Sequence, residues 1–167
     1  MPDFDLTAQE GRLFLCLFHK TTKNRKINLQ IAVRNEIRKK LLKISGIDST
    51  RIQLPNTTFK KPDKSVWIRE SVNERSEEPI SNAAGCEFMV VNYEIFCKAS
   101  LGADRVDNVA EALRIALPVS GTGSTIYQKN GQYAFIKSID KPAGGIDSAE
   151  PTWYRSLVAV TIKLYNL

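Results

Sequence analysis

The clearest hydrophobic pattern in the chain starts at Cys86 and predicts a long strand that ends near Ala99. Side chains alternate between the two faces of a strand. One face would carry Met89, Val91, Tyr93, Ile95 and Cys97, and the other Phe88, Val90, Asn92, Glu94 and Phe96. The first face is almost wholly apolar, whereas the second begins apolar and becomes polar. We therefore predict a central strand that is covered along one side and over one end of the other.

An amphipathic helix is predicted directly after this strand. Gly102 interrupts the strand pattern, and Asp104 is the expected N-cap. Apolar residues then recur at helical spacing, at Val106, Val109, Ala110, Leu113 and Leu117. Pro118 ends the pattern, because the residue before a proline disfavours helical geometry. A strand that leads into such a helix requires the helix to lie back on the sheet.

The remaining periodic segments complete an α+β fold. A helix is expected from Asn24 to Ile44, stopped at Gly46. Strands are expected at Arg51–Leu54, Ser65–Val72, Ile126–Lys129, Gln132–Ile139 and Trp153–Tyr165, and loops at Asn73–Ala84 and Lys141–Pro151. Asn130-Gly131 separates two of the strands and is a strong hairpin signal. We predict a mostly antiparallel sheet of four to six strands with two or three helices packed on it.

The first 24 residues form the least regular part of the chain and are interpreted as an N-terminal arm or short helix. Thr7 to Glu10 has the form of a capping box. Leu13, Cys16 and Leu17 would then share one helical face. Residues 25–167 are predicted to form a single domain, which is an ordinary length for one hydrophobic core.

Charge is unevenly distributed. The segment from Lys20 to Lys43 contains nine basic residues and one acid, Glu36, so its net charge is +8. The whole chain has a net charge of +6, and the rest of the chain therefore carries about −2. Such a patch suits nucleic acid or an acidic protein surface, or is simply a solvated helix face. No apolar run approaches a membrane span, and we expect no membrane partner. Cys86 and Cys97 would lie about 36 Å apart on one strand, so they cannot pair with each other.

Candidate chemistry is sparse, and we expect a protein that is not an enzyme and has no cofactor or metal. His19 and Cys16 lie one helical turn apart, but nothing at obvious spacing would orient the histidine. No zinc-binding spacing is present. Trp67 shares a strand face with Arg69, and these residue types are enriched in protein interfaces. Core packing is the alternative for Trp67.

The order of motifs resembles a known family. An amphipathic helix is followed by Asn56-Thr-Thr-Phe59, Pro62 and Trp67-Ile-Arg69, then by the polar loop, the long strand, Gly102 and a helix to Leu117. A strand that opens with Trp153 comes last. Over residues 25–165 this resembles the tail terminator (tail completion) proteins of long-tailed bacteriophages, of the lambda gpU type. Residues 1–24 are additional to that pattern.

The resemblance implies a structural virion protein that forms a hexameric ring. The ring would cap the tail tube, stop its polymerisation and join the tail to a head-side connector or stopper protein, and genomic DNA would pass through it without specific binding. Its place would be the head-proximal end of the virion tail, and the host cytoplasm during assembly. The expected assembly interface comprises Trp67, Arg69, Glu77, Glu78, Asn130, Arg34 and Arg38.

Two alternatives remain open from the sequence. The first is another head–tail joining protein, namely a stopper, neck or tube subunit. The second is a nucleic-acid-binding module that uses the basic helix 24–44, whose affinity would fall steeply with salt. A tube subunit polymerises alone, whereas a terminator stops at one ring.

Overall fold

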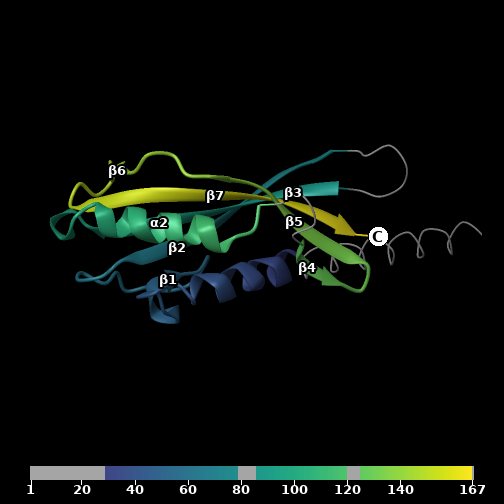
Figure 1. Cartoon of the computed structure of the whole chain (residues 1–167). Helices are drawn as coiled ribbons and strands as arrows, with labels where there is room; N and C mark the ends of the chain where they lie inside the picture. The colour runs from purple at the N-terminus through teal and green to yellow at the C-terminus, as the bar shows by residue number, and fades with distance from the viewer. Residues whose placement is uncertain (1–28, 79–85, 120–124, 167) are drawn as a thin grey trace, which may run out of the picture.

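A computed structural model describes residues 29–78, 86–119 and 125–166, and it confirms the α+β fold (Figure 1). One curled sheet has the strand order β1-β2-β3-β7-β5-β4, and a short strand, β6, pairs with β7. Every neighbouring pair is antiparallel except β1 and β2, which run parallel. The sheet is therefore mostly antiparallel, as predicted.

The first half of the described chain contains one helix and the two strands at one side of the sheet. The helix ends at residue 41, and Gly46 follows with a left-handed φ of 81°. A 3-10 turn, η1 (Ser49–Arg51), leads into β1 (Ile52–Gln53). Strand β2 (Trp67–Glu78) is longer than predicted, since it continues for six residues into the polar stretch assigned to a loop. Antiparallel pairing with β3 supplies its backbone hydrogen bonds, so β2 does not depend on apolar side chains there.

The central strand and its helix follow the sequence pattern. Strand β3 (Cys86–Lys98) leads through a 3-10 turn, η2 (Ala99–Leu101), to helix α2 (Asp104–Ala116). The predicted N-cap is wrong by one residue: Ala103 is the cap, and Asp104 is the first helical residue. Its carboxylate still lies in the first turn, where the helix dipole favours negative charge.

The last four strands include the predicted hairpin. Strands β4 (Thr125–Lys129) and β5 (Gln132–Asp140) are joined by Asn130 and Gly131, both with positive φ as a type I′ turn requires. Strand β6 (Gly145–Ile146) lies within the segment predicted as a loop, and β7 (Trp153–Asn166) closes the chain. A register shift between Ile136 and Ser138 marks a bulge in β5 opposite β7.

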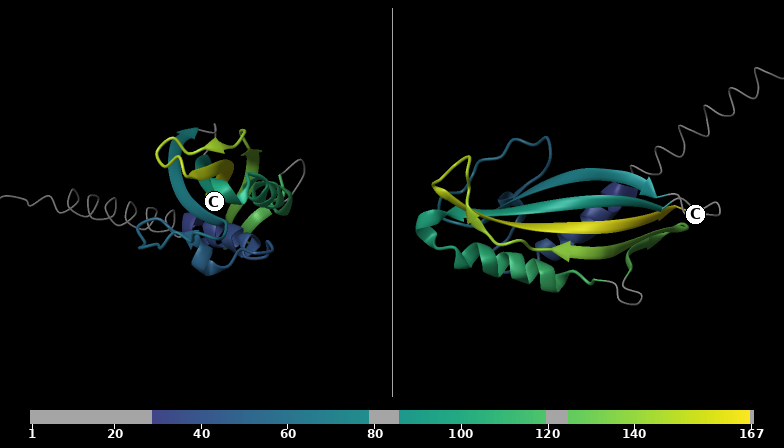
Figure 2. Two further views of the ribbon diagram at one scale, coloured as in Figure 1. Left: turned by 90° about the vertical axis from the view of Figure 1, so that its left-hand side faces the viewer. Right: turned by 90° about the horizontal axis from the view of Figure 1, so that it is seen from above.

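Both helices cover the same face of the sheet. The inward residues of β3, from Met89 to Cys97, are fully buried in one core with side chains of helix 29–41 and of α2. Helix α2 packs on β3 and β7. The right-hand view of Figure 2 shows the opposite face with no helix over the strands. We call this surface the open face; its side chains come from alternate positions of β2, β3, β7 and β5.

One end of the open face is closed by a small aromatic cluster. The Trp67 ring stacks on Phe96 with centroids 4.3 Å apart, and Trp153 meets Trp67 edge-on at 5.8 Å. Phe59 packs against the cluster from the loop before β2. The second face of the central strand is thus covered at Phe96, because the two tryptophans of the neighbouring strands meet there. Toward the apolar start of the same face, Val90 is also buried, at 6% exposed.

The turn between β3 and α2 depends on Gly102, whose φ of 89° and ψ of 140° suit only glycine. A Cβ atom at this position would meet no atom within 4 Å, so a substitution tests backbone strain alone. Gly102→Ala should lower the free energy of unfolding by about 1–3 kcal/mol in denaturant titration. Gly145→Ala is the matched control, because Gly145 also has open space and lacks a positive φ; equal effects of the two substitutions would contradict the prediction.

Candidate assembly surfaces

The seven residues predicted as an interface lie in three separate places. Trp67 and Arg69 share the open face near the aromatic cluster. Glu77, Glu78 and Asn130 lie at the opposite end of the sheet. Arg34 and Arg38 project from helix 29–41 toward β2 on the covered face. The sequence therefore did not identify one continuous site.

Strand register brings the two hairpin-forming pairs together at one end. Glu78 pairs with Cys86, Cys86 with Tyr165, and Tyr165 with Tyr133. Asn130 lies just beyond this row, at the exposed turn before β5. The predicted contact regions at Glu77, Glu78 and Asn130 thus belong to the same end of the sheet, although more than 50 residues separate them in the sequence.

An ionic triad lies next to the aromatic cluster on the open face. Arg69 Nε donates to Glu94 at 2.6 Å, and Arg155 donates to the other oxygen of the same carboxylate at 3.1 Å. The hydrogen bond from Arg69 to Glu94 raises the pKa of that guanidinium, and the Arg69 side chain stays 44% exposed. The triad therefore presents two accessible cations around one partly covered carboxylate.

Aromatic rings and a lysine lie further along the open face. Lys137 Nζ stands 4.6 Å from the centre of the Phe88 ring, and Phe135 meets Tyr165 edge-on at 5.9 Å. These side chains are half-buried or exposed, in contrast to the fully buried residues on the other side of the same strands. Aromatic and cationic groups of this kind are enriched at protein interfaces.

Trp67 belongs to the interior of the single chain. Its side chain is only 2% exposed, so the core-packing alternative accounts for it and an accessible interface ring does not. Its indole N–H is buried and has no hydrogen-bond partner among the described residues. Of the pair singled out from the sequence, only Arg69 is available to a partner.

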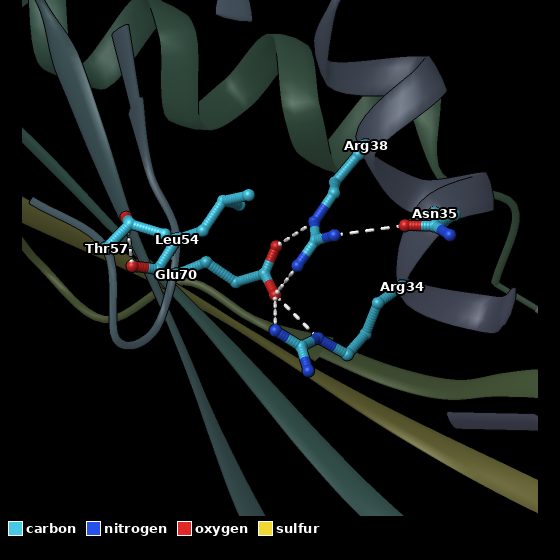
Figure 3. Close-up of polar contacts among 6 residues, drawn as sticks. All are labelled: Arg34, Asn35, Arg38, Leu54, Thr57 and Glu70. Atoms are coloured by element: carbon cyan, nitrogen blue, oxygen red, sulfur yellow. Dashed lines mark hydrogen bonds and ion pairs between the residues drawn. The ribbon is translucent and has the colours of Figure 1, made fainter. Parts of the chain in front are cut away.

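Arg34 and Arg38 clamp a buried carboxylate that sequence reasoning missed (Figure 3). Glu70 has no exposed side-chain surface, and both its oxygens accept hydrogen bonds, from Arg34 Nε at 2.6 Å and from Arg38 Nε at 2.7 Å. The bond to Glu70 raises the pKa of Arg38, and burial raises the pKa of the neighbouring Tyr93 hydroxyl. The sequence held one signal for this contact. Glu70 is the one acid on an otherwise apolar face of the predicted strand Ser65–Val72, and Arg34 and Arg38 lie one helical turn apart on the basic helix.

The outer edge of β2 is largely unpaired. Strand β1 pairs only with Ile68 and Arg69. Within residues 29–78, 86–119 and 125–166, no strand pairs with this side of β2 from Glu70 to Glu78. Such an edge offers backbone donors and acceptors to an added strand.

Comparison of the sequence with protein-family models and with curated proteins gives no match. Several solved structures have a similar fold; one of them is 14% identical with a TM-score of 0.54, over 80% of this chain and 96% of that chain. At this identity the likeness concerns the fold alone. Among the described residues no acidic, cysteine and histidine side chains group as metal ligands would, and no described helix could cross a membrane.

Trp67→Ala should lower the free energy of unfolding by about 3–5 kcal/mol, because it removes the central ring of a packed cluster. Chemical denaturation measures the change. Ile146→Ala, at a side chain that is 58% exposed, should change the free energy by less than about 0.5 kcal/mol. A stable Trp67→Ala protein that has lost self-association would instead identify Trp67 as an interface residue.

Glu70→Ala should cost about 3–5 kcal/mol of unfolding free energy, since it leaves two partly buried guanidinium groups without their carboxylate. Replacing all three residues with Leu at position 70 and Met at positions 34 and 38 should recover most of that loss. Glu36→Gln is the control, because Glu36 pairs with Lys39 at the exposed surface, where an ion pair contributes less than about 1 kcal/mol. If Glu70→Ala and Glu36→Gln have the same effect, the clamp is not a stabilising feature.

Proposed function

We propose that this chain is a structural virion subunit that forms a closed ring at the head-proximal end of a phage tail. The family resemblance implies six copies in the ring. The ring caps the tail tube, stops its growth and joins the tail to the head-side connector or stopper. The observation that carries the proposal is the open face: a long-stranded sheet has one face buried under two helices and no helix over the other, which has exposed cations and half-buried aromatic rings. A sheet face of this composition suits contact with another protein.

The unpaired edge of β2 and the shared hairpin end give further support. A ring needs two different surfaces on each subunit, which meet head to tail. The open face and the β2 edge are different surfaces of one sheet, and the end with Glu78 and Asn130 provides a third. The fold agrees with the α+β domain that the resemblance implies.

The nucleic-acid alternative receives less support from the arrangement of the basic helix. Two of its cations, Arg34 and Arg38, bind Glu70 within the chain, and Lys39 pairs with Glu36. Fewer charges remain for phosphate contacts than the sequence suggests. DNA passage through the ring without specific binding is consistent with this arrangement.

The proposal is tested by mass and by tube growth. Six copies of an 18.7 kDa chain form a particle of about 112 kDa in light scattering, seen as a ring in electron micrographs, either alone or on the tube end. Added in small molar amounts, the protein stops elongation of its cognate tube subunit. Ala159→Arg, which adds a long cation at a half-buried position of the open face, should abolish ring formation or capping with native circular dichroism.

Ser100→Arg is the matched control, because Ser100 is exposed and lies in η2, outside the sheet. It should assemble normally. Filaments formed by the protein alone would favour the tube-subunit alternative. A chain that stays monomeric with its tube subunit and leaves elongation unchanged would refute the proposal.

A further inference from the structure

An apolar groove runs between the two helices on the covered side of the molecule. It has a volume of about 560 Å³ and lies between the end of helix 29–41 and α2. Its apolar lining consists of Ile44, Val109, Ala112, Ile115 and Ala116. Ile115 is 71% exposed and lies beside the other apolar residues of this lining. The groove thus leaves an apolar surface uncovered that a partner segment would bury.

Lysines line one side of this groove. Lys40 and Lys43 both line it, and neither forms an ion pair with any residue that the structure describes. Glu111, the acid of α2 directly before Ala112, pairs with Arg114 and Lys141 instead. The groove therefore favours a ligand that is apolar on one side and acidic on another.

The N-terminal segment of the chain has this composition. Residues 1–18 carry three acids, Asp3, Asp5 and Glu10, against one base, Arg12. The apolar run Leu13 to Phe18 follows, with Leu13, Cys16 and Leu17 at helical spacing. The segment is additional to the pattern that the rest of the chain follows, so the assembly role proposed above leaves it unused.

Charge favours a groove on another copy over the segment's own. To reach its own groove, the segment would have to bring the four bases between Lys20 and Lys26 back alongside the helix that carries Lys39 and Lys40, where like charges repel. A groove on a head-to-tail neighbour avoids this repulsion.

We propose that residues 3–18 of one copy dock in the groove between helix 29–41 and α2 of the next copy, with Asp3, Asp5 and Glu10 near Lys40 and Lys43. The inference rests on the proposed ring, because it requires neighbouring copies. It adds a specific contact, in which an arm of each subunit ties it to its neighbour.

Disulfide cross-linking of the full chain tests this contact. Cysteine is placed singly at Val109, Ala112 or Ile115, and mild oxidation allows it to pair with the natural Cys16 where the two approach closely. Cys86 and Cys97 are fully buried and do not compete. At least one of the three variants should give linked species of two or more chains on a non-reducing gel. Linkage should disappear when Cys16→Ser is added.

Ser100→Cys provides the background, since that exposed site lies outside the groove. No linkage above this background at any of the three positions would overturn the proposal, as would linkage confined to single chains. Lys40→Glu with Lys43→Glu should reduce linkage roughly three- to tenfold, and Asp3→Lys with Asp5→Lys should restore it. If the variant with Lys40→Glu and Lys43→Glu links as well as the unmodified pair, the two lysines do not attract the acids of the arm.

The mass of the unmodified chain separates this inference from the proposed function. A ring or a capped tube without linkage defeats the arm contact alone. A chain that neither associates nor caps defeats the proposed function, whatever the gel shows.

Discussion

Burial of the inner side of β3 is the constraint on which the other features depend. Five consecutive inward side chains, from Met89 to Cys97, are fully buried, and β7 places Val158, Val160 and Ile162 beside them. Burying that much apolar surface stabilises the fold only if both helices lie on this side. Because both helices pack on this side, the opposite side of the sheet is left to solvent or to another protein. The open face is thus a consequence of how the core is built.

The Glu70 clamp explains why helix 29–41 sits where it does. Apolar contact alone would allow the helix to slide or rotate on the sheet, since many aliphatic packings have similar energies. A buried carboxylate held by Arg34 and Arg38 accepts few geometries, so it fixes the helix against β2. The same contact withdraws two cations from the surface, so that the basic appearance of this segment overstates the charge it presents.

Sequence patterns predicted the elements that apolar alternation or turn chemistry determines, namely β3, β7, α2 and the hairpin at Asn130-Gly131. Sequence patterns failed where a contact with a distant segment of the same chain determines the structure. The polar residues of β2 beyond Val72 become strand because β3 pairs with them, and Glu70 is buried because two arginines reach it. The bulge after Ile136 was also missed: it returns Ile139 to the core, and the odd spacing of Ile136 and Ile139 was its only trace.

The bare edge of β2 restricts the symmetry of any assembly that uses it. Beyond Asn73 the sequence of β2 contains three acids, Glu74, Glu77 and Glu78, and one base, Arg75. Two copies of this segment paired about a dyad within it would bring a net negative charge onto adjacent strands, and like charges there repel. Pairing of the β2 edge with the same edge of another copy is thereby disfavoured, whereas pairing with a strand that lacks this negative charge is not. An edge with this charge therefore favours a head-to-tail contact over a closed two-fold dimer.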